Sequence, residues 1–360
     1  MAQLLNEIEW GQALLPRVGD PAWEAEVKRR AGRVNEVDRR VAANPWVREV
    51  CVSIASYRPA VVPQRLFNIG ALVTAQENSC RYCYGANRAF MRMLGYSESF
   101  ISRIERDSTL ADLDEKERAF IAFCRNLARS RPRPMKAEVD ALVALGFTPM
   151  AVAEMAMLIV GSCFYNRIGI LIACPPELGF ERVAHGFLGR ILGPMMRLAM
   201  SMQRAVPVSA ADVATLKAGP FGTVVAALVG VPGATSLRAG LDGAFASAVL
   251  PKSTKALMFA VVARTLDCRI SEREARTLLA DEGFDDAEID STLLALRSSR
   301  LSQRDIRLLS WVRETVHYQT AAIQAQTRTL AGEFGDAVIL EAIGVAALSN
   351  AVVRLAMLLE

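Results

Sequence analysis

Residues 68–97 of the chain read NIGALVTAQENSCRYCYGANRAFMRMLGYS, and this stretch decides how the rest is interpreted. An apolar helical segment leads into Cys80 and Cys83, which are three residues apart and close enough for a disulfide within one turn. At a helix start, unpaired amides and the helix dipole favour a thiolate. Because a thiolate attacks peroxides and disulfides, the pair is a candidate redox site.

The segment that holds the pair recurs further along the chain. One constant offset in residue number aligns Pro63 with Pro251, Cys80 with Cys268, Arg88 with Arg276, Gly95 with Gly283 and Leu113 with Leu301. After a gap of one residue, the offset is smaller by one and aligns Phe147 with Phe334, Glu154 with Glu341 and Arg167 with Arg354. Matches that stay collinear over roughly 100 residues predict an internal duplication.

The repeat gives a map of the chain. It predicts an N-terminal helical arm (1–50), a first repeat with the CxxC pair (51–178), a connector (179–238) and a degenerate second repeat (239–360). The connector holds an amphipathic segment, GFLGRILGPMMRLAMSMQRAV, and a tail rich in Gly and Pro. We interpret the amphipathic segment as a packing element between the repeats or at a subunit contact.

Helix signals are present throughout, and no hairpin signature interrupts them. Ser97 follows a Gly-Tyr break, Asp114 and Glu117 have capping-box spacing, and Thr148-Pro149 has the pattern of an N-cap followed by proline. These signals predict an all-α fold.

Composition excludes several functional classes. The chain has 360 residues, is 52% apolar and carries a formal charge of +4 with mixed signs, so no basic stripe predicts nucleic-acid binding. Glu7 and Glu9 interrupt any secretory signal, and the apolar stretch near 150–175 contains charged residues. We therefore expect a cytoplasmic protein with no membrane partner.

The seven cysteines do not form the pattern of a secreted disulfide framework. We expect those outside the CxxC pair to be buried and reduced, namely Cys51, Cys124, Cys163, Cys174 and Cys268. A zinc site needs further Cys or His ligands, and the two histidines, His185 and His317, lack ligand spacing. Neither a metal nor a cofactor is expected.

Three features together resemble the AhpD-like alkyl hydroperoxidase and carboxymuconolactone decarboxylase superfamily. They are the motif N-x-C-x-x-C at 78–83, the Leu94-Gly95 turn and Asn166-Arg167 on a later helix. The resemblance implies an all-α tandem AhpD-like bundle and, because subunits of the family assemble, a homo-oligomer. It also implies that Cys83 attacks a small hydroperoxide and Cys80 resolves the product. A thioredoxin-like or lipoyl-bearing protein would then reduce the disulfide.

The chain departs from the family pattern at both proton-relay positions. Asn68 and Asn87 stand where the resemblance implies a glutamate and a histidine, and an amide is no general base near neutral pH. Glu77, three residues before Cys80, is the substitute that we predict, and Tyr82 and Tyr84 are alternatives. A solvated charge near a helix end is the simpler interpretation of Glu77.

The second repeat lacks the site. Cys268 survives, but Ser271 stands at the position of the second cysteine and Ala256 and Ala275 at the relay positions. We therefore expect a structural half that completes a pseudo-dimer. Glu154, Glu341, Arg167 and Arg354 recur on the last long helix of each repeat and are expected to form structural ion pairs.

Three functions remain open at this stage. The first is a thiol-dependent oxidoreductase that reduces a peroxide through a dithiol–disulfide cycle. The second is a non-catalytic ligand-binding or redox-sensing protein, which the missing relay residues favour. The third, a decarboxylase-type lyase, would need a carboxylate and histidine pocket, and the absence of histidine from both relay positions argues against it.

Overall fold

A computed structural model of the chain describes residues 3–107, 109, 111–186, 193–195, 198, 213–296 and 298–360. Over these residues the secondary structure is helical with no strand, so the predicted all-α class is confirmed. The helices are η1 (Leu5–Glu7), α1 (Pro21–Ala31), α2 (Glu36–Arg40), α3 (Pro45–Ala55), α4 (Gln64–Glu77), α5 (Arg81–Met93), α6 (Glu98–Arg106), α7 (Glu115–Arg129), α8 (Lys136–Ala144), α9 (Pro149–Leu171), α10 (Leu178–His185), α12 (Val213–Lys217), α13 (Gly222–Ala226), α14 (Gly233–Ala246), α15 (Lys252–Thr265), α16 (Arg269–Asp281), α17 (Asp286–Ala295), α18 (Gln303–Glu314), α19 (Thr320–Phe334) and α20 (Asp336–Met357).

The predicted helix starts are confirmed where the capping signals are strongest. Ser97 caps α6, Asp114 and Glu117 form a capping box on α7, and Thr148 caps α9 with Pro149 at its first position. Each capping side chain accepts a hydrogen bond from a backbone amide left free at a helix start. Local sequence therefore sets these boundaries.

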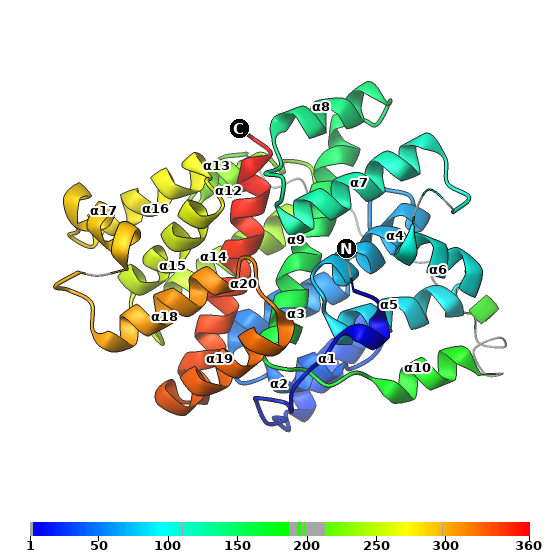
Figure 1. The fold of residues 1–360 in the computed structure, drawn as a ribbon, viewed down its shortest axis with the longest axis horizontal. Coiled ribbons are helices and arrows are strands. Elements are labelled where there is room, and N and C mark those ends of the chain that lie inside the picture. Colours follow the sequence, from blue (N-terminus) through cyan, green and yellow to red (C-terminus); the bar gives the residue numbers. More distant parts are fainter. Residues whose placement is uncertain are drawn as a thin grey trace.

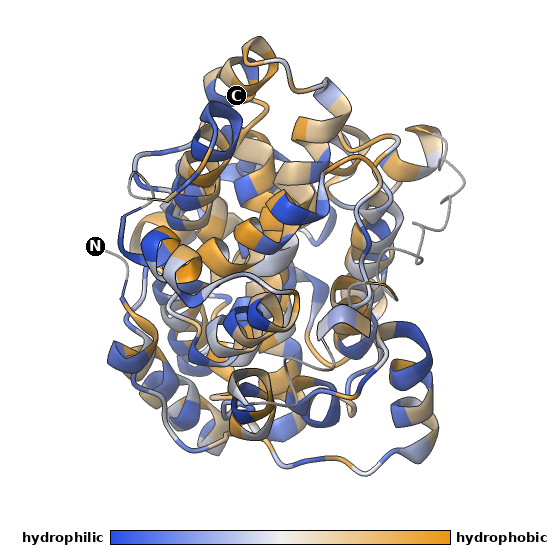
Figure 2. Ribbon diagram, turned by 90° about the vertical axis from the view of Figure 1, so that its right-hand side faces the viewer, coloured by the Kyte–Doolittle hydropathy of each residue, from blue (hydrophilic) through white to orange (hydrophobic). Residues whose placement is uncertain are grey.

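Two long helices form the centre of the protein. α9 and α20 pack against each other and are nearly surrounded by the shorter helices (Figure 1). α4, α5 and α7 cover α9, whereas α15, α16 and α19 cover α20. Hydrophobic residues gather along the inner helices (Figure 2), and one large buried cluster runs through both sides. The central helix pair thus joins the two sides of the molecule through a shared core.

Both central helices are also long and apolar enough, by length and composition, to cross a membrane. In the most apolar window, 72% of α9 and 94% of α20 is buried inside the protein. Core helices of soluble proteins pass the same test, so length and composition do not assign either helix to a membrane.

Helix bounds follow the offset found in the sequence. α4 and α15, α5 and α16, α6 and α17, and α7 and α18 each begin at the offset that separates Cys80 from Cys268, and α9 and α20 begin at the offset that is smaller by one. The residues two positions before α5 and α16, Ser79 and Asp267, have positive φ values of 51° and 53°. α4 packs against α5, α7 and α9, and α15 packs against α16, α18 and α20. Bounds, turns and packing therefore repeat together.

All three predicted domain boundaries fall inside helices. The boundary at 178/179 lies after the first residue of α10, the boundary at 50/51 lies within α3 and the boundary at 238/239 lies within α14. α3 and α14 begin at the same offset as the helices that follow them, and they pack against each other. Each therefore belongs with the half that follows it. The sequence matches begin only at Pro63, which is why they missed this pair. Most of the amphipathic connector segment lies outside the described residues.

The recurring glutamates are both buried, with different partners. Glu154 accepts hydrogen bonds from the Tyr57 hydroxyl (2.8 Å) and from backbone amides of the loop after α3, including Ala60 and Val62. Glu341 forms an ion pair with the fully buried Lys255 (3.1 Å). Glu341 therefore forms an ion pair, but with a lysine and not with one of the recurring arginines, and Glu154 orders a loop through hydrogen bonds.

The expected ion pairs of Arg167 and Arg354 are wrong. Both side chains are buried, and among the described residues neither pairs with a carboxylate. Arg167 donates to the carbonyls of Thr315 (3.2 Å) and Val316 (3.4 Å), and Arg354 donates to those of Val316 (3.2 Å) and Ala128 (3.3 Å). Burial and the neighbouring Arg167 lower the pKa of Arg354 to about 9. Carbonyl dipoles therefore take the place of the expected acids.

Candidate functional site

The CxxC pair occupies the start of α5, as predicted. Cys80 is the N-cap residue, and the backbone amide of Cys83 donates to its sulfur at 3.4 Å. Both side chains are buried, and all seven cysteines carry free thiols. The prediction that Cys51, Cys124, Cys163 and Cys174 are buried and unpaired is also confirmed.

Gly169 on α9 brings the pair against the centre of the protein. A Cβ atom at this glycine would stand 3.4 Å from the Cys80 sulfur, 3.7 Å from the Cys83 sulfur and 3.7 Å from the Tyr82 ring. The two sulfurs and the ring thus converge on one point of the α9 backbone. A Cβ alone would make ordinary contacts there, whereas a longer side chain would crowd the sulfurs. A small residue at this position therefore allows the close approach of α5 and α9.

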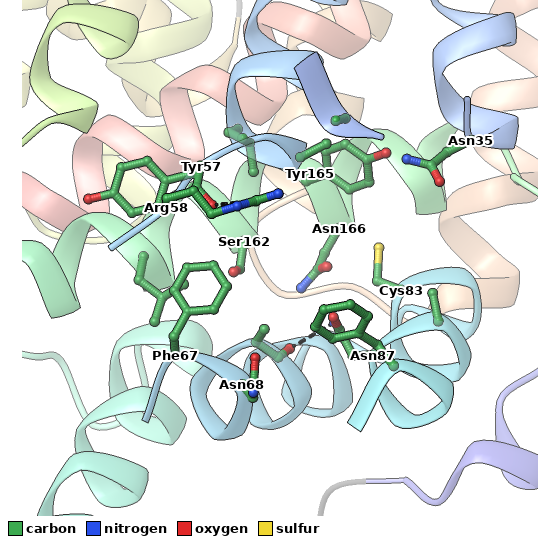
Figure 3. Close-up of a pocket in the computed structure, with 18 of the residues that line it drawn as sticks. Asn35, Tyr57, Arg58, Phe67, Asn68, Cys83, Asn87, Ser162, Tyr165 and Asn166 are labelled. Atoms are coloured by element: carbon green, nitrogen blue, oxygen red, sulfur yellow. Dashed lines mark hydrogen bonds between the residues drawn. The ribbon is translucent and has the colours of Figure 1, made fainter. Parts of the chain in front are cut away.

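Cys83 opens onto a cavity of about 470 Å³ (Figure 3). This size is typical of pockets for small organic molecules. Cys80 and Glu77 do not line it, so the structure brings only Cys83 of the three predicted site residues to the cavity. The walls come from α3, α4, α5, α9, α10 and α14, from the loop after α3, and from the end of α1 and the loop that follows it. Its polar lining residues are Arg33, Asn35, Ser53, Tyr57, Arg58, Gln64, Asn68, Tyr82, Asn87, Ser162, Tyr165, Asn166 and Ser236.

Amides dominate the polar part of the cavity wall near the thiol. Asn68 and Asn87, at the relay positions of the resembled family, both line it. The Asn87 side chain is anchored through its Nδ2 to the carbonyl of Ala71 at 3.2 Å. Asn166 is 2% exposed, and its Nδ2 has no hydrogen-bond partner among the residues that the structure describes. A buried donor without an acceptor is costly, so this amide is suited to an oxygen atom of a ligand.

Tyr82 connects the thiol site to a carboxylate. Its hydroxyl donates to Glu177 at 2.9 Å, and Glu177 also pairs with Arg33 at 3.2 Å. Burial is the main cause that raises the pKa of the Tyr82 hydroxyl well above its usual range. Tyr82 therefore stays protonated near neutral pH and can donate a proton that Glu177 helps to orient.

The surroundings of Cys83 keep its thiol neutral. Burial, and then the hydrogen bond with Cys80, raises the pKa of Cys83 well above its usual range. The start of α5 does not offset this desolvation, contrary to the expectation of a favoured thiolate. Formation of the nucleophile thus requires a group that accepts its proton.

Glu77 lies in a different environment from the cavity. Its carboxylate pairs with Arg125 at 3.3 Å and with Arg129, both on α7. Burial raises the pKa of Glu77, and Arg129 and Arg125 oppose the shift. Its side chain is 1% exposed, so it is not the solvated charge of the simpler interpretation. This position gives Glu77 a role in joining α4 to α7, and its catalytic role stays a prediction. Tyr84, on the same helix as Tyr82, does not line the cavity.

The second half has a different interior at the corresponding place. Cys268 is the N-cap residue of α16, but its sulfur accepts no capping hydrogen bond from the described backbone amides of the helix start, and Ser271 is fully buried. Phe259 corresponds to Ala71 of the cavity wall, is fully buried and stacks on Phe221 with ring centroids 4.2 Å apart. Burial raises the pKa of the Cys268 thiol to about 11. An aromatic core therefore occupies the region where the first half has a cavity.

The cavity walls that come from segments distant in sequence from the CxxC pair were not predicted. Asn35 and Arg33 come from the arm, Arg58 from the loop after α3, and Ser236 from α14. None of them belongs to a motif, and their approach to Cys83 depends on tertiary packing. No cluster of three or more His, Cys, Asp or Glu side chains able to hold a metal occurs over the part of the chain that the structure describes.

Comparison with protein-family models, with curated proteins and with solved structures finds no match to the chain.

Proposed function

We propose that the protein is a thiol-dependent oxidoreductase that reduces a hydroperoxide at Cys83 and closes a disulfide with Cys80. The observation that carries the proposal is the unequal placement of the two sulfurs. Both sulfurs lie against Gly169, but of the two only Cys83 lines the cavity. This arrangement suits an attacking and a resolving thiol. The sequence resemblance to AhpD-like proteins supports the same order, and the repeated helix bounds support a tandem duplication of that fold.

The chemistry balances in two steps. The Cys83 thiol passes its proton to the Tyr82–Glu177 pair, and the thiolate attacks the outer oxygen of a hydroperoxide. The O–O bond breaks, and the departing alkoxide takes the proton back from that pair to give an alcohol. The resulting sulfenic acid then reacts with the Cys80 thiol, which forms the disulfide and releases water. A thioredoxin-like or lipoyl-type dithiol is the reductant that the resemblance implies, and it returns the disulfide to two thiols.

Proton transfer is assigned here to Tyr82 and Glu177 in place of the expected Glu77. The Tyr82 ring lies against Gly169 of α9, as the two sulfurs do, and its hydroxyl donates a hydrogen bond to Glu177. Asn166 offers its unpaired amide hydrogen to the oxygen that leaves. General acid–base assistance contributes roughly 10²–10⁴ in rate. We therefore expect Tyr82→Phe to slow thiol oxidation by about 10²-fold and Glu77→Gln to leave its rate unchanged.

Thiol counting after addition of one equivalent of cumene hydroperoxide tests the proposal. The wild-type protein should lose two free thiols, Cys83→Ser none, and Cys80→Ser one, with a sulfenic acid trapped by dimedone. Cys124→Ser, another buried cysteine, is the matched control and should again lose two. Peroxide consumption that persists in Cys83→Ser, with the variant folded by circular dichroism, would contradict the proposal.

A second function is favoured by the raised pKa of Cys83 and by the amides that replace a general base. In this reading the cavity binds a ligand without turning it over, and the CxxC pair is a sensor or is silent. The same thiol count separates the two functions, because a binding protein would keep all its thiols at stoichiometric peroxide.

A further inference from the structure

Three asparagines line the cavity, and they differ in the partners of their amides. The Asn68 oxygen accepts a hydrogen bond from Gln64 at 3.0 Å, and the Asn87 nitrogen donates to the carbonyl of Ala71 at 3.2 Å. For Asn166, the described part of the chain supplies neither an acceptor to the nitrogen nor a donor to the oxygen. A side-chain amide has two N–H donors and an acceptor oxygen, so the whole hydrogen-bonding capacity of Asn166 is available to a ligand.

The Asn166 amide is enclosed by the protein and faces the cavity. The residue is 2% exposed and lies on α9, one of the two central helices. Figure 3 shows its amide between the Ser162 hydroxyl and the Cys83 sulfur, pointing from α9 toward the α5 side of the cavity. A buried polar group without a partner is costly, and a ligand that supplies the partner recovers that cost on binding.

The second half shows that the helical scaffold does not need an amide at this place. At the offset that aligns Arg167 with Arg354, the residue that corresponds to Asn166 is Val353, which is fully buried. Alanines stand at the positions of the other two asparagines, and an aromatic core occupies that interior. The amide therefore accompanies the cavity and not the fold, which favours a role in binding what the cavity holds.

We infer that the cavity binds an uncharged organic molecule through a carboxamide or lactam group that pairs edge to edge with the Asn166 amide. The ligand carbonyl accepts a hydrogen bond from Asn166 Nδ2, and the ligand N–H donates to the Asn166 oxygen, so both amides are satisfied. Asparagine side chains bind the edge of adenine through the same kind of paired hydrogen bonds. A ketone or a carboxylate would satisfy only the nitrogen.

The walls determine the rest of the ligand. Phe67 and Phe90 line the cavity, so an apolar or aromatic body gains from burial against them. The inference goes beyond the proposed function, because this pairing requires no thiol chemistry.

Calorimetric titration with 3-phenylpropanamide and with 4-phenylbutan-2-one tests this inference. The two molecules have the same shape, and a methyl group in the ketone replaces the amino group of the amide. The amide should bind roughly tenfold more tightly, because the ketone leaves the Asn166 oxygen without a donor. A cavity without this pairing would prefer the ketone, which loses less hydration on burial.

Substitutions of the asparagines assign the preference to one side chain. Asn166→Leu should remove the preference for the amide, and so should Asn166→Val, which introduces the residue found at the corresponding position of the second half. Asn68→Leu is the matched control in the same cavity. Since the Asn68 amide already bonds to Gln64 and to the Tyr96 hydroxyl, this variant should keep the preference. Circular dichroism verifies that each variant is folded.

The outcomes separate this inference from the thiol function. Absent, equal or weaker binding of the amide by the wild-type protein would overturn the inference even if cumene hydroperoxide oxidises the thiols. A preference for the amide that persists in a folded Asn166→Leu or Asn166→Val variant would overturn it as well. A preference that is lost in these variants and kept in Cys83→Ser supports it, whatever the thiol count shows.

Discussion

The two halves of the chain use the same helix bounds for different interiors. In the first half, Ala71 on α4 faces a cavity that reaches Cys83 and is lined by several amides. In the second half, Phe259 on α15 is fully buried against Phe221, and Ser271 and Ala275 are buried in turn. The small residue Ala71 thus lines a cavity in the first half, whereas the large residue Phe259 is part of a packed core at the corresponding position of the second half. The helical scaffold therefore does not by itself require a cavity.

The largest effect on stability is expected from a substitution in the aromatic core of the second half. Phe259→Ala removes a fully buried ring that stacks on Phe221, and such changes cost about 3–5 kcal/mol of unfolding free energy. Urea denaturation measures this loss. Leu294→Ala, at a side chain that is 83% exposed in the same half, is the control and should stay within about 0.5 kcal/mol of wild type. A stable Phe259→Ala variant would show that this core is not tightly packed.

The reciprocal change tests the first half. Ala71→Phe places a ring in the cavity beside the helix that carries Cys83, which should exclude ligand while leaving the cysteines in place. We expect peroxide-dependent thiol loss to slow by roughly 10²-fold, since the reacting atoms no longer approach each other. Stopped-flow thiol measurements give the rate. Ala122→Phe, an exposed change on α7, should behave as wild type. Unchanged oxidation in Ala71→Phe would place the reaction outside the cavity.

The N-terminal arm contains a buried carboxylic acid whose effect on stability should depend on pH. Asp38 is fully buried, and within the described part of the chain its Oδ1 has no hydrogen-bond partner. Burial raises its pKa from 3.8 to about 6. The nearby Glu177 raises it further, and Arg33 opposes the shift. A raised pKa means that the carboxylate form is disfavoured in the folded protein, so its contribution to stability falls as the pH rises from about 4 to 6.

Asp38→Asn should therefore stabilise the protein by about 3 kcal/mol at pH 7.5, because the shift is about two pKa units and each unit corresponds to about 1.4 kcal/mol. The gain should vanish at pH 4. Denaturation at both pH values measures it, with the exposed Glu9→Gln change as control. A gain that is equal at pH 4 and pH 7.5 would show that charge is not its cause.

The smallest effect is expected at the remaining cysteine of the second half. Cys268→Ser should leave peroxide-dependent thiol loss unchanged and cost less than about 1 kcal/mol, because a hydroxyl can also bond to Glu360, which lies 3.6 Å from the sulfur. Mass spectrometry of the alkylated protein measures which cysteines oxidise. Oxidation of Cys268 at the rate of Cys83 would mean that the second half is also reactive.

Local signals carried most of what the sequence predicted. The helix class, the caps at Ser97 and Thr148 and the place of Cys80 at a helix start depend on neighbouring residues, and these expectations agree with the structure. The Tyr82–Glu177 bond joins two residues that are distant in the sequence, so no local pattern reveals it. The same holds for Asn35 of the arm, which reaches the cavity only through tertiary packing.

The expected ion pairs of the buried arginines failed for a different reason. A charged side chain in an apolar helix predicts a partner, but a backbone carbonyl is available at every residue and leaves no mark in the sequence. Arg167 and Arg354 both use the carbonyl of Val316, a residue that a search for acidic partners would not consider.

The Val316 carbonyl that Arg167 and Arg354 share has a consequence for folding during synthesis. Arg167 leaves the ribosome well before Val316, and synthesis at about 5–20 residues per second makes that interval on the order of ten seconds. Throughout that time the guanidinium has only the Cys163 carbonyl of its own helix and lacks the carbonyls of Thr315 and Val316, so α9 cannot bury it at low cost. We therefore expect the first half to stay incompletely packed until α18 and the turn after it have left the ribosome. A chain released before that turn should be a substrate for chaperones and proteases even though its redox motif is complete.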